Sequence, residues 1–316
     1  MGPRHGLEPL VRILIWHVHG AWTSAFIRGG HTYVLPLVPD RGPDGRGRAA
    51  TYDWPDNARE VPWDRLRDEP IDVAVYQRPH EIDLAREWLG RDVPGIYVEH
   101  NTPKGDVPHT RHPLADRSDI TLVHVTHFNE LYWDNGKAPT RVIEHGVPDP
   151  GHLYTGELPR AGVVVNEPVR RTRVAGTDLL PRFAERVPLD VFGMGVNGLP
   201  YRAYEDLPQH LMHAELAKRR VYLHPYRWTS LGLALIEAMT LGMPVVALAA
   251  TEAVEAVPPE AGVLSTKVHV LADALHAFAA DPESAAQAGK EARAAALARY
   301  GLGRFLSDWD RLLAEV

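Results

Sequence analysis

The chain has 316 residues, about twice the length of an ordinary domain, so two domains of similar size are expected. Its formal net charge of −7 offers no basic surface for nucleic acid or an anionic membrane, and we expect neither as a partner. The sequence has no cysteine, which excludes disulfides, thiolate zinc sites and cysteine nucleophiles and is consistent with a cytoplasmic location. The first apolar stretch, Leu14 to Trp16, is too short for a signal segment or an integral membrane segment and predicts a buried strand.

Short runs rich in Val and Ile alternate with helical patterns along the whole chain. This alternation is typical of parallel strands joined by crossover helices, so we predict an α/β fold with two doubly wound domains. The Gly/Pro-rich stretch 146–159 shows no helical or strand periodicity of apolar residues, so we expect the domain boundary within it. We place this boundary near residue 158, which gives domains 1–158 and 159–316. After Ser265 the pattern is helical to the end, with a break at Gly301 and Gly303. Strands are expected at 11–18, 32–38, 71–77, 95–100, 120–126, 140–146, 161–166, 189–195, 220–225, 243–249 and 261–265.

The segment 224–248 (HPYRWTSLGLALIEAMTLGMPVVAL) reads as a strand end, a loop, a helix and the next strand. Gly242 followed by Pro244 closes the helix in the usual way. Ser230, Leu231 and Gly232 stand at the helix N-terminus, where free backbone N–H groups and the positive end of the dipole favour an anion. A diphosphate suits such a site.

Glu237 falls about one and a half turns into this helix, among apolar residues. A buried carboxylate is costly unless it is hydrogen-bonded, so either the protein itself or the hydroxyl groups of a ligand must satisfy it. The two hydroxyls of a ribose would do so, and the distance to the helix N-terminus matches that between the sugar and the phosphates of a nucleotide.

The same segment resembles the signature of retaining glycosyltransferases of family 4, which have the GT-B fold of two Rossmann-like domains facing across a cleft. Glu237 falls at the second glutamate of the Glu-x7-Glu motif, whereas Thr229 replaces the first glutamate and Leu231 replaces a phenylalanine. The resemblance implies that Glu237 binds the donor ribose and that Thr229, Ser230, Leu231 and Gly232 line the donor site. It also implies that the last helix, about 302–316, packs back on the N-terminal domain.

Family members carry an Arg and a Lys after the first strand of the donor domain, where they neutralise the diphosphate. This sequence has Arg170, Arg171 and Arg173 there, and arginine binds phosphate oxygens well. The alternative is a solvated basic loop, and the sequence does not rank Arg171 above Arg173. His224, at the strand end before the donor loop, is either a core histidine or a contact to the donor sugar or phosphate.

The N-terminal domain has two polar strand exits that resemble the family's acceptor-side segments. HVHGAW provides His17, His19 and Gly20, and VEHNTPKG provides Glu99, His100 and Asn101; these two sets are the predicted acceptor-side residues. Carboxyl ends of parallel strands are where open α/β sheets place their ligands. Among seventeen histidines, each is also a candidate for a plain surface or core residue.

The two histidines of HTRH (109–112) could form a metal-ligand pair, but no carboxylate cluster accompanies them in the sequence. The sequence also has no Asp-x-Asp motif. We therefore expect no metal and no other cofactor. The resemblance implies a hexosyl- or heptosyltransferase that moves a sugar from a nucleotide-diphosphate-sugar donor to a hydroxyl acceptor with retention, with His100, Arg171 and Glu237 as the predicted catalytic residues. The alternatives are a sugar-nucleotide epimerase and a non-catalytic nucleotide-sugar-binding protein; the base is left open.

Overall fold

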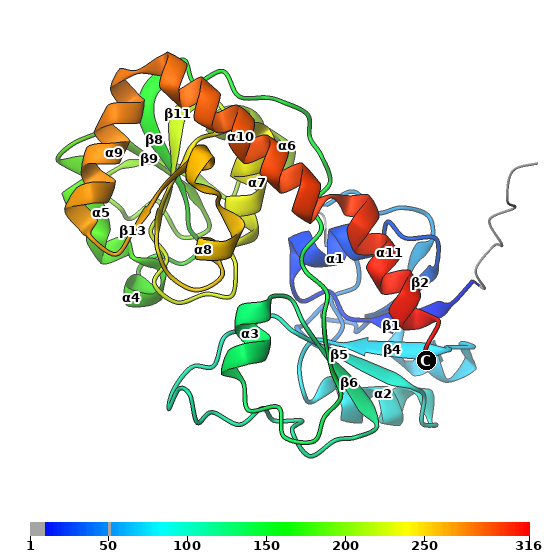
Figure 1. Cartoon of the computed structure of the whole chain (residues 1–316). Coiled ribbons are helices and arrows are strands. Elements are labelled where there is room, and N and C mark those ends of the chain that lie inside the picture. Colours follow the sequence, from blue (N-terminus) through cyan, green and yellow to red (C-terminus); the bar gives the residue numbers. More distant parts are fainter. Residues whose placement is uncertain (1–9, 50–51) are drawn as a thin grey trace, which may run out of the picture. The chain divides into compact units, whose positions relative to one another are not determined.

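The computed structural model describes residues 10–49 and 52–316, which form two compact α/β units (Figure 1). The first unit extends to Gly146 and also includes Gly303–Val316, and the second unit is Val147–Leu302. Each unit holds one parallel sheet, so the predicted fold class is confirmed. Among the residues described, no helix combines the length and the apolar character that crossing a membrane requires.

The division between the units falls twelve residues before the boundary expected at 158. The Gly/Pro-rich stretch does connect the units, but its second part already packs on the second one. The backbone N–H of Tyr154 donates to the carbonyl of Leu241, and that of Thr155 donates to the carbonyl of Ala217. These bonds cannot be read from local composition, which is why the sequence places the boundary later than the division in the structure.

The sheet of the first unit has the strand order β3-β2-β1-β4-β5-β6-β7, with all neighbours parallel. Its strands are short, and the five inner ones are almost wholly buried, as expected when helices cover both faces. The strands are β1 Arg12–Ile15, β2 Thr32–Leu37, β3 Ala58–Pro62, β4 Val73–Tyr76, β5 Gly95–Glu99, β6 Ile120–His124 and β7 Thr140–Val142. The helices are α1 Gly20–Phe26, η1 Trp63–Asp68, α2 Glu81–Leu89, α3 His127–Tyr132 and α11 Leu302–Leu313.

The last helix, α11, packs within the first unit through one aromatic face. Trp309 lies edge-on against Trp22 and Phe26 of α1, with ring centroids 5.7 Å and 4.8 Å apart. Gly146 leaves room for this helix, because a Cβ there would stand 2.3 Å from Cβ of Phe305. Aromatic burial of this kind explains why the chain returns to its first unit after crossing the second.

The sheet of the second unit has the order β10-β9-β8-β11-β12-β13 and is also parallel throughout. Its strands are β8 Leu158–Val164, β9 Leu189–Gly193, β10 Arg202–Glu205, β11 Arg219–His224, β12 Val245–Leu248 and β13 Gly262–Ser265. Its helices are α4 Thr172–Ala175, η2 Thr177–Leu179, α5 Leu180–Ala184, α6 Gln209–Leu216, α7 Leu233–Leu241, α8 Ala253–Ala256, η3 Pro259–Ala261, α9 Val268–Ala280 and α10 Pro282–Tyr300.

Strands β3 and β10 were not predicted. Both are outermost in their sheets, and both carry two charged residues instead of an apolar run: Arg59 and Glu60 in β3, and Arg202 and Glu205 in β10. Only central strands, buried on both faces, give the continuous Val/Ile runs on which the prediction depended.

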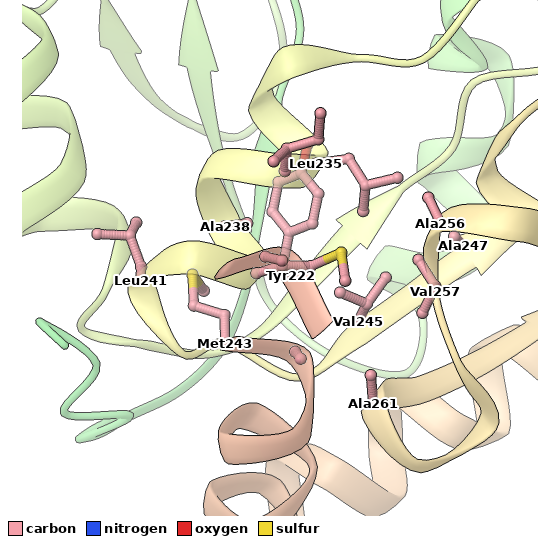
Figure 2. Close-up of a cluster of buried hydrophobic side chains, with 14 of the residues drawn as sticks. Tyr222, Leu235, Ala238, Leu241, Met243, Val245, Ala247, Ala256, Val257 and Ala261 are labelled. Carbon is pink, nitrogen blue, oxygen red and sulfur yellow. The ribbon is translucent and has the colours of Figure 1, made fainter. Parts of the chain in front are cut away.

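Helix α7 is held by the core of the second unit. Leu235, Ala238 and Leu241 pack with Tyr222 of β11 and with Val245 of β12, and all five are buried (Figure 2). Gly242 ends the helix at φ 95°, a left-handed conformation that favours glycine. Gly242 thus fixes the C-terminal end of α7, and the N-cap Gly232 lies close to His224 at the carboxyl end of β11.

Candidate functional site

The N-terminus of α7 rests on a histidine ring. Gly232 is the N-cap of α7, and a Cβ at this position would lie 2.8 Å from Cε1 of His224. The first N–H groups of any helix have no partner within the helix, so they are available to an anion. Leu231 is buried in the hydrophobic core, so only its backbone can take part, and Ser230 is also buried.

His224 is a buried and uncharged support for this helix end. Its residue exposure is 2%, and burial lowers its pKa to about 3. Its ring stacks on Tyr226 with centroids 4.8 Å apart. The ring lies between Tyr226 and Gly232, and a contact of His224 with a donor sugar or phosphate stays a prediction.

The three predicted arginines differ sharply in their surroundings. Arg170 pairs with Glu167, and Arg173 pairs with Asp178 at 3.1 Å. Arg171 has no carboxylate partner among the residues described, and its guanidinium carbon lies 5.7 Å from the centroid of the Tyr226 ring. Of these three arginines, Arg171 is therefore the one that forms no ion pair with a described carboxylate.

These contacts place four groups in one continuous column. The Arg171 guanidinium lies over Tyr226, Tyr226 stacks on His224, and His224 packs beneath Gly232. The column joins the loop after β8 to the N-terminus of α7. A free positive charge and a set of helix N–H groups thus belong to the same surface of the second unit, an arrangement that suits phosphate oxygens.

Glu237 is buried in α7, with a residue exposure of 5%, and its own chain satisfies part of it. Gln209 donates from Nε2 to Oε1 of Glu237 at 2.8 Å. Nε2 of His213 stands 3.6 Å from Oε2 and has no hydrogen-bond partner among the residues that the structure describes. The sequence left open whether the protein or a ligand satisfies this carboxylate. The protein satisfies Oε1 through Gln209, whereas Oε2 faces His213.

In the first unit, the structure brings His19 and His100 together. Their rings stack with centroids 3.9 Å apart, and Trp22 packs edge-on against His100 at 5.0 Å. Burial is the main cause that lowers the pKa of both rings, that of His19 to about 4. Nε2 of His100 is buried and has no hydrogen-bond partner within the described part of the chain, so this neutral ring retains an unused polar atom.

His17 lies apart from that stack, against a different pair of rings. Trp54 and Tyr52 contact it edge-on, with centroids at 5.0 Å and 5.9 Å. Gly20 begins α1 beneath Tyr52, whose ring atoms would lie 2.6 Å from a Cβ at this position. Burial, and next the nearby Arg46, lowers the pKa of His17 to about 4.

Both carboxylate oxygens of Glu99 are bound by neighbouring groups of the first unit. Its Oε1 accepts from the backbone N–H of Asn101 at 2.6 Å, and its Oε2 lies 3.1 Å from Nε2 of His112. Nδ1 of His112 accepts from the N–H of Leu114, so Nε2 carries the proton and donates to Glu99. Glu99 thus braces the loop after β5, and Asn101 is held by it.

The metal reading of HTRH finds no ligand set. His112 is committed to Glu99. Among residues 10–49 and 52–316, no group of three or more His, Cys, Asp or Glu side chains could hold a metal ion.

Sequence reasoning did not single out Tyr226, Gln209 and His213. Tyr226 lies within the segment 224–248, and its position between the strand end and the helix is the sequence feature that could have identified it. Gln209 and His213 come from α6, 28 and 24 residues before Glu237. Only the fold shows that they meet the carboxylate.

Two Rossmann-like parallel-sheet units and a helix N-terminus joined to a free arginine define the class of the molecule: it has the GT-B fold. Residues 199–295, which include α6, α7 and Glu237, match the family model described as glycosyl transferases group 1. No curated protein sequence matches the chain significantly.

Solved structures agree on the fold. Sucrose-phosphate synthase from Thermosynechococcus elongatus matches with a TM-score of 0.71 at 15% identity, covering 96% of this chain and 98% of that one. HepE from Anabaena, in complex with UDP, matches with a TM-score of 0.68 at 15% identity, covering 97% and 100%. TarM from S. aureus, also crystallised with UDP, matches with a TM-score of 0.60 at 16% identity over 76% of this chain, which spans 55% of TarM.

Proposed function

We propose that the chain is a glycosyltransferase that moves a sugar from a nucleotide-diphosphate-sugar donor to a hydroxyl acceptor, with retention and without a metal ion. The observation that carries this proposal is the column from Arg171 through Tyr226 and His224 to Gly232 at the N-terminus of α7. The match of residues 199–295 to glycosyl transferases group 1 and the UDP complexes of HepE and TarM support it.

In this proposal the second unit binds the donor. The backbone from Ser230 to Gly232 and the guanidinium of Arg171 contact the diphosphate, and Glu237 contacts the ribose hydroxyls. During transfer the bond from the anomeric carbon to the diphosphate oxygen breaks, and negative charge grows on that oxygen. Fixed N–H dipoles and Arg171 stabilise this charge without reorganisation, which lowers the barrier.

The acceptor oxygen attacks from the face that the diphosphate leaves, so the new glycosidic bond keeps the anomeric configuration. The hydroxyl proton of the acceptor passes to the departing diphosphate oxygen, and no protein nucleophile is needed. We assign His100 to the acceptor side, because its Nε2 is a neutral group without a hydrogen-bond partner. Arg171 supplies the charge that a metal provides in other enzymes, so activity should survive EDTA.

The first test is a thermal-shift panel of ADP, GDP and UDP on the full chain, because a nucleotide that binds only the folded state raises Tm. The base that stabilises most is then offered as its glucose, N-acetylglucosamine and heptose derivatives, with release of nucleoside diphosphate as the readout. Turnover that is lost in Glu237→Ala supports the transferase. Binding without turnover over a broad acceptor screen overturns it in favour of a non-catalytic nucleotide-sugar-binding protein, which Thr229 in place of the family's glutamate would suit.

A further inference from the structure

Asp178 and Arg227 form a bidentate ion pair beside the column. Nη1 of Arg227 donates to Oδ1 of Asp178 at 2.6 Å, and Nη2 donates to Oδ2 at 2.9 Å. Asp178 belongs to η2, which follows α4, whereas Arg227 belongs to the segment that leads from β11 to α7. The pair therefore links two loops that are about fifty residues apart in the sequence.

Backbone contacts accompany the ion pair. The N–H of Arg227 donates to the carbonyl of Val174 at 2.9 Å, and its Nη1 also donates to the carbonyl of Arg173 at 2.9 Å. Gly176, at φ 73°, lets the two segments touch, since a Cβ there would lie 1.8 Å from the carbonyl oxygen of Pro225. Helix α4 is thus docked on residues 225–227 through its backbone carbonyls, and η2 is docked there through the side chain of Asp178.

This docking determines where Arg171 stands. Arg171 is the N-cap of α4, and its carbonyl accepts from the N–H of Ala175 at 2.8 Å. The ring that its guanidinium covers, Tyr226, is the neighbour of Arg227 in the chain. Both members of the cation–π contact therefore sit on the two segments that the Asp178–Arg227 pair joins.

The geometry distinguishes this pair from an ordinary surface ion pair. Isolated exposed pairs contribute little, but bidentate arginine–carboxylate pairs are the strong and directional ones. Here the side chains are 29% and 25% exposed, and Asp178 also accepts from Arg173 at 3.1 Å. The pair uses the charge of Arg173 as well, which leaves Arg171 as the cation that can face a ligand.

We propose that Asp178 and Arg227 are positioning residues, which hold α4 on the segment 225–227 so that the guanidinium of Arg171 points at the diphosphate of a nucleotide donor. The proposal rests on the proposed function, because it assumes that Arg171 contacts a diphosphate. It adds two residues that do not themselves touch the ligand.

The test measures binding of ADP, GDP and UDP, and of their matching nucleosides, by titration calorimetry on the full chain. The variants are Asp178→Asn, Arg227→Lys, Arg171→Met and the double variant Asp178→Asn with Arg171→Met. Asp273→Asn is the matched control, because it removes the exposed ion pair between Arg186 and Asp273 in the same unit. Circular dichroism checks that each variant is folded.

We expect Asp178→Asn and Arg227→Lys to weaken diphosphate binding about tenfold and to change nucleoside binding by less than about twofold. The double variant should bind the diphosphate no more than about twofold more weakly than Arg171→Met alone, because both changes remove the same contact. If Asp178→Asn does not fold, Arg227→Lys carries the test, since it keeps the positive charge.

Wild-type diphosphate affinity in both single variants would overturn the positioning role, and so would an equal loss for nucleosides or independent, multiplying effects in the double variant. If the wild type binds none of the three diphosphates, the proposed function fails and takes this inference with it. If the wild type binds and Asp178→Asn and Arg227→Lys are unaffected, only the inference fails.

Discussion

Gln209 donates a hydrogen bond from Nε2 to Oε1 of Glu237 at 2.8 Å, so one half of this buried carboxylate is already bound by its own chain. The other oxygen, Oε2, stands 3.6 Å from Nε2 of His213. A ribose that takes both oxygens of Glu237 has to share Oε1 with Gln209, which that oxygen allows because it can accept two hydrogen bonds. A ribose that binds only Oε2 meets a carboxylate whose position is already fixed by the hydrogen bond from Gln209 to Oε1.

Glu237→Gln should weaken the binding of a nucleoside and of its diphosphate by the same factor, about tenfold or more. The change keeps the shape but removes a charge-assisted hydrogen bond of about 1.5 to 3 kcal/mol, and about 1.4 kcal/mol corresponds to tenfold. Titration calorimetry with uridine and UDP, or with the pair of the base that binds, measures it.

Glu291→Gln is the matched control for that variant. Glu291 also accepts from a glutamine, with Gln287 Nε2 at 2.9 Å, but this pair lies on the exposed side of α10. Its affinities should equal those of the wild type. A loss in Glu237→Gln that is confined to the diphosphate would show that the carboxylate does not contact the nucleoside.

Arg171→Met should weaken diphosphate binding at least tenfold while leaving nucleoside binding within about twofold, because it removes the one unpaired cation of the loop. Methionine keeps an apolar contact with Tyr226, so the column remains packed. Arg170→Met is the comparison, since that charge is neutralised by Glu167, and it should cost less than about threefold. Equal losses in the two variants would contradict the ranking.

The sequence predicted the central strands and the long helices because these elements are buried and strictly periodic. It also located the N-terminus of α7, since Gly232 and the helix after it are local features. It did not rank Arg171 above its neighbours, because their ion pairs with Glu167 and Asp178 depend on side-chain placement. The support of Glu237 by α6 is a tertiary contact, and no local pattern encodes it.

Thr229→Glu should change the preference for the transferred sugar without changing the affinity for the nucleotide. Thr229 takes the place of the first glutamate in the family motif, three residues before the N-cap Gly232. We expect the affinity for the nucleoside diphosphate to stay within about twofold, since the helix N-terminus and Arg171 are untouched. The measured quantity is kcat/KM for a panel of donor sugars that share one base.

The ranking of donor sugars should differ between Thr229→Glu and the wild type. Thr229→Gln, which has the same length but no charge, separates an effect of charge from an effect of size. An unchanged ranking in both variants would show that position 229 does not contact the sugar. A loss of nucleotide affinity in both variants would mean that Thr229 contributes to binding of the diphosphate instead.

Stability should fall as the pH is lowered from about 6.5 toward 4, because buried histidines stay neutral in the folded chain. Burial, and next the neighbours His19 and Arg304, lowers the pKa of His145 to about 3, and burial lowers that of His19 to about 4. The unfolded chain binds these protons at ordinary pKa values near 6.5. Between the two pKa values the unfolded state therefore holds more protons, and the free energy of unfolding decreases as the pH falls.

His145→Gln removes one such group from the first unit, so its free energy of unfolding should fall less steeply with decreasing pH, by up to about 1.4 kcal/mol per pH unit between pH 6 and 4.5. Urea unfolding at pH 7, 6, 5 and 4.5, followed by circular dichroism, measures the slope. His109→Gln, an exposed change in the same unit, should keep the wild-type slope. If His145→Gln also keeps it, His145 is protonated in the folded chain at these pH values, and its unpartnered Nδ1 must then find an acceptor that this structure does not provide.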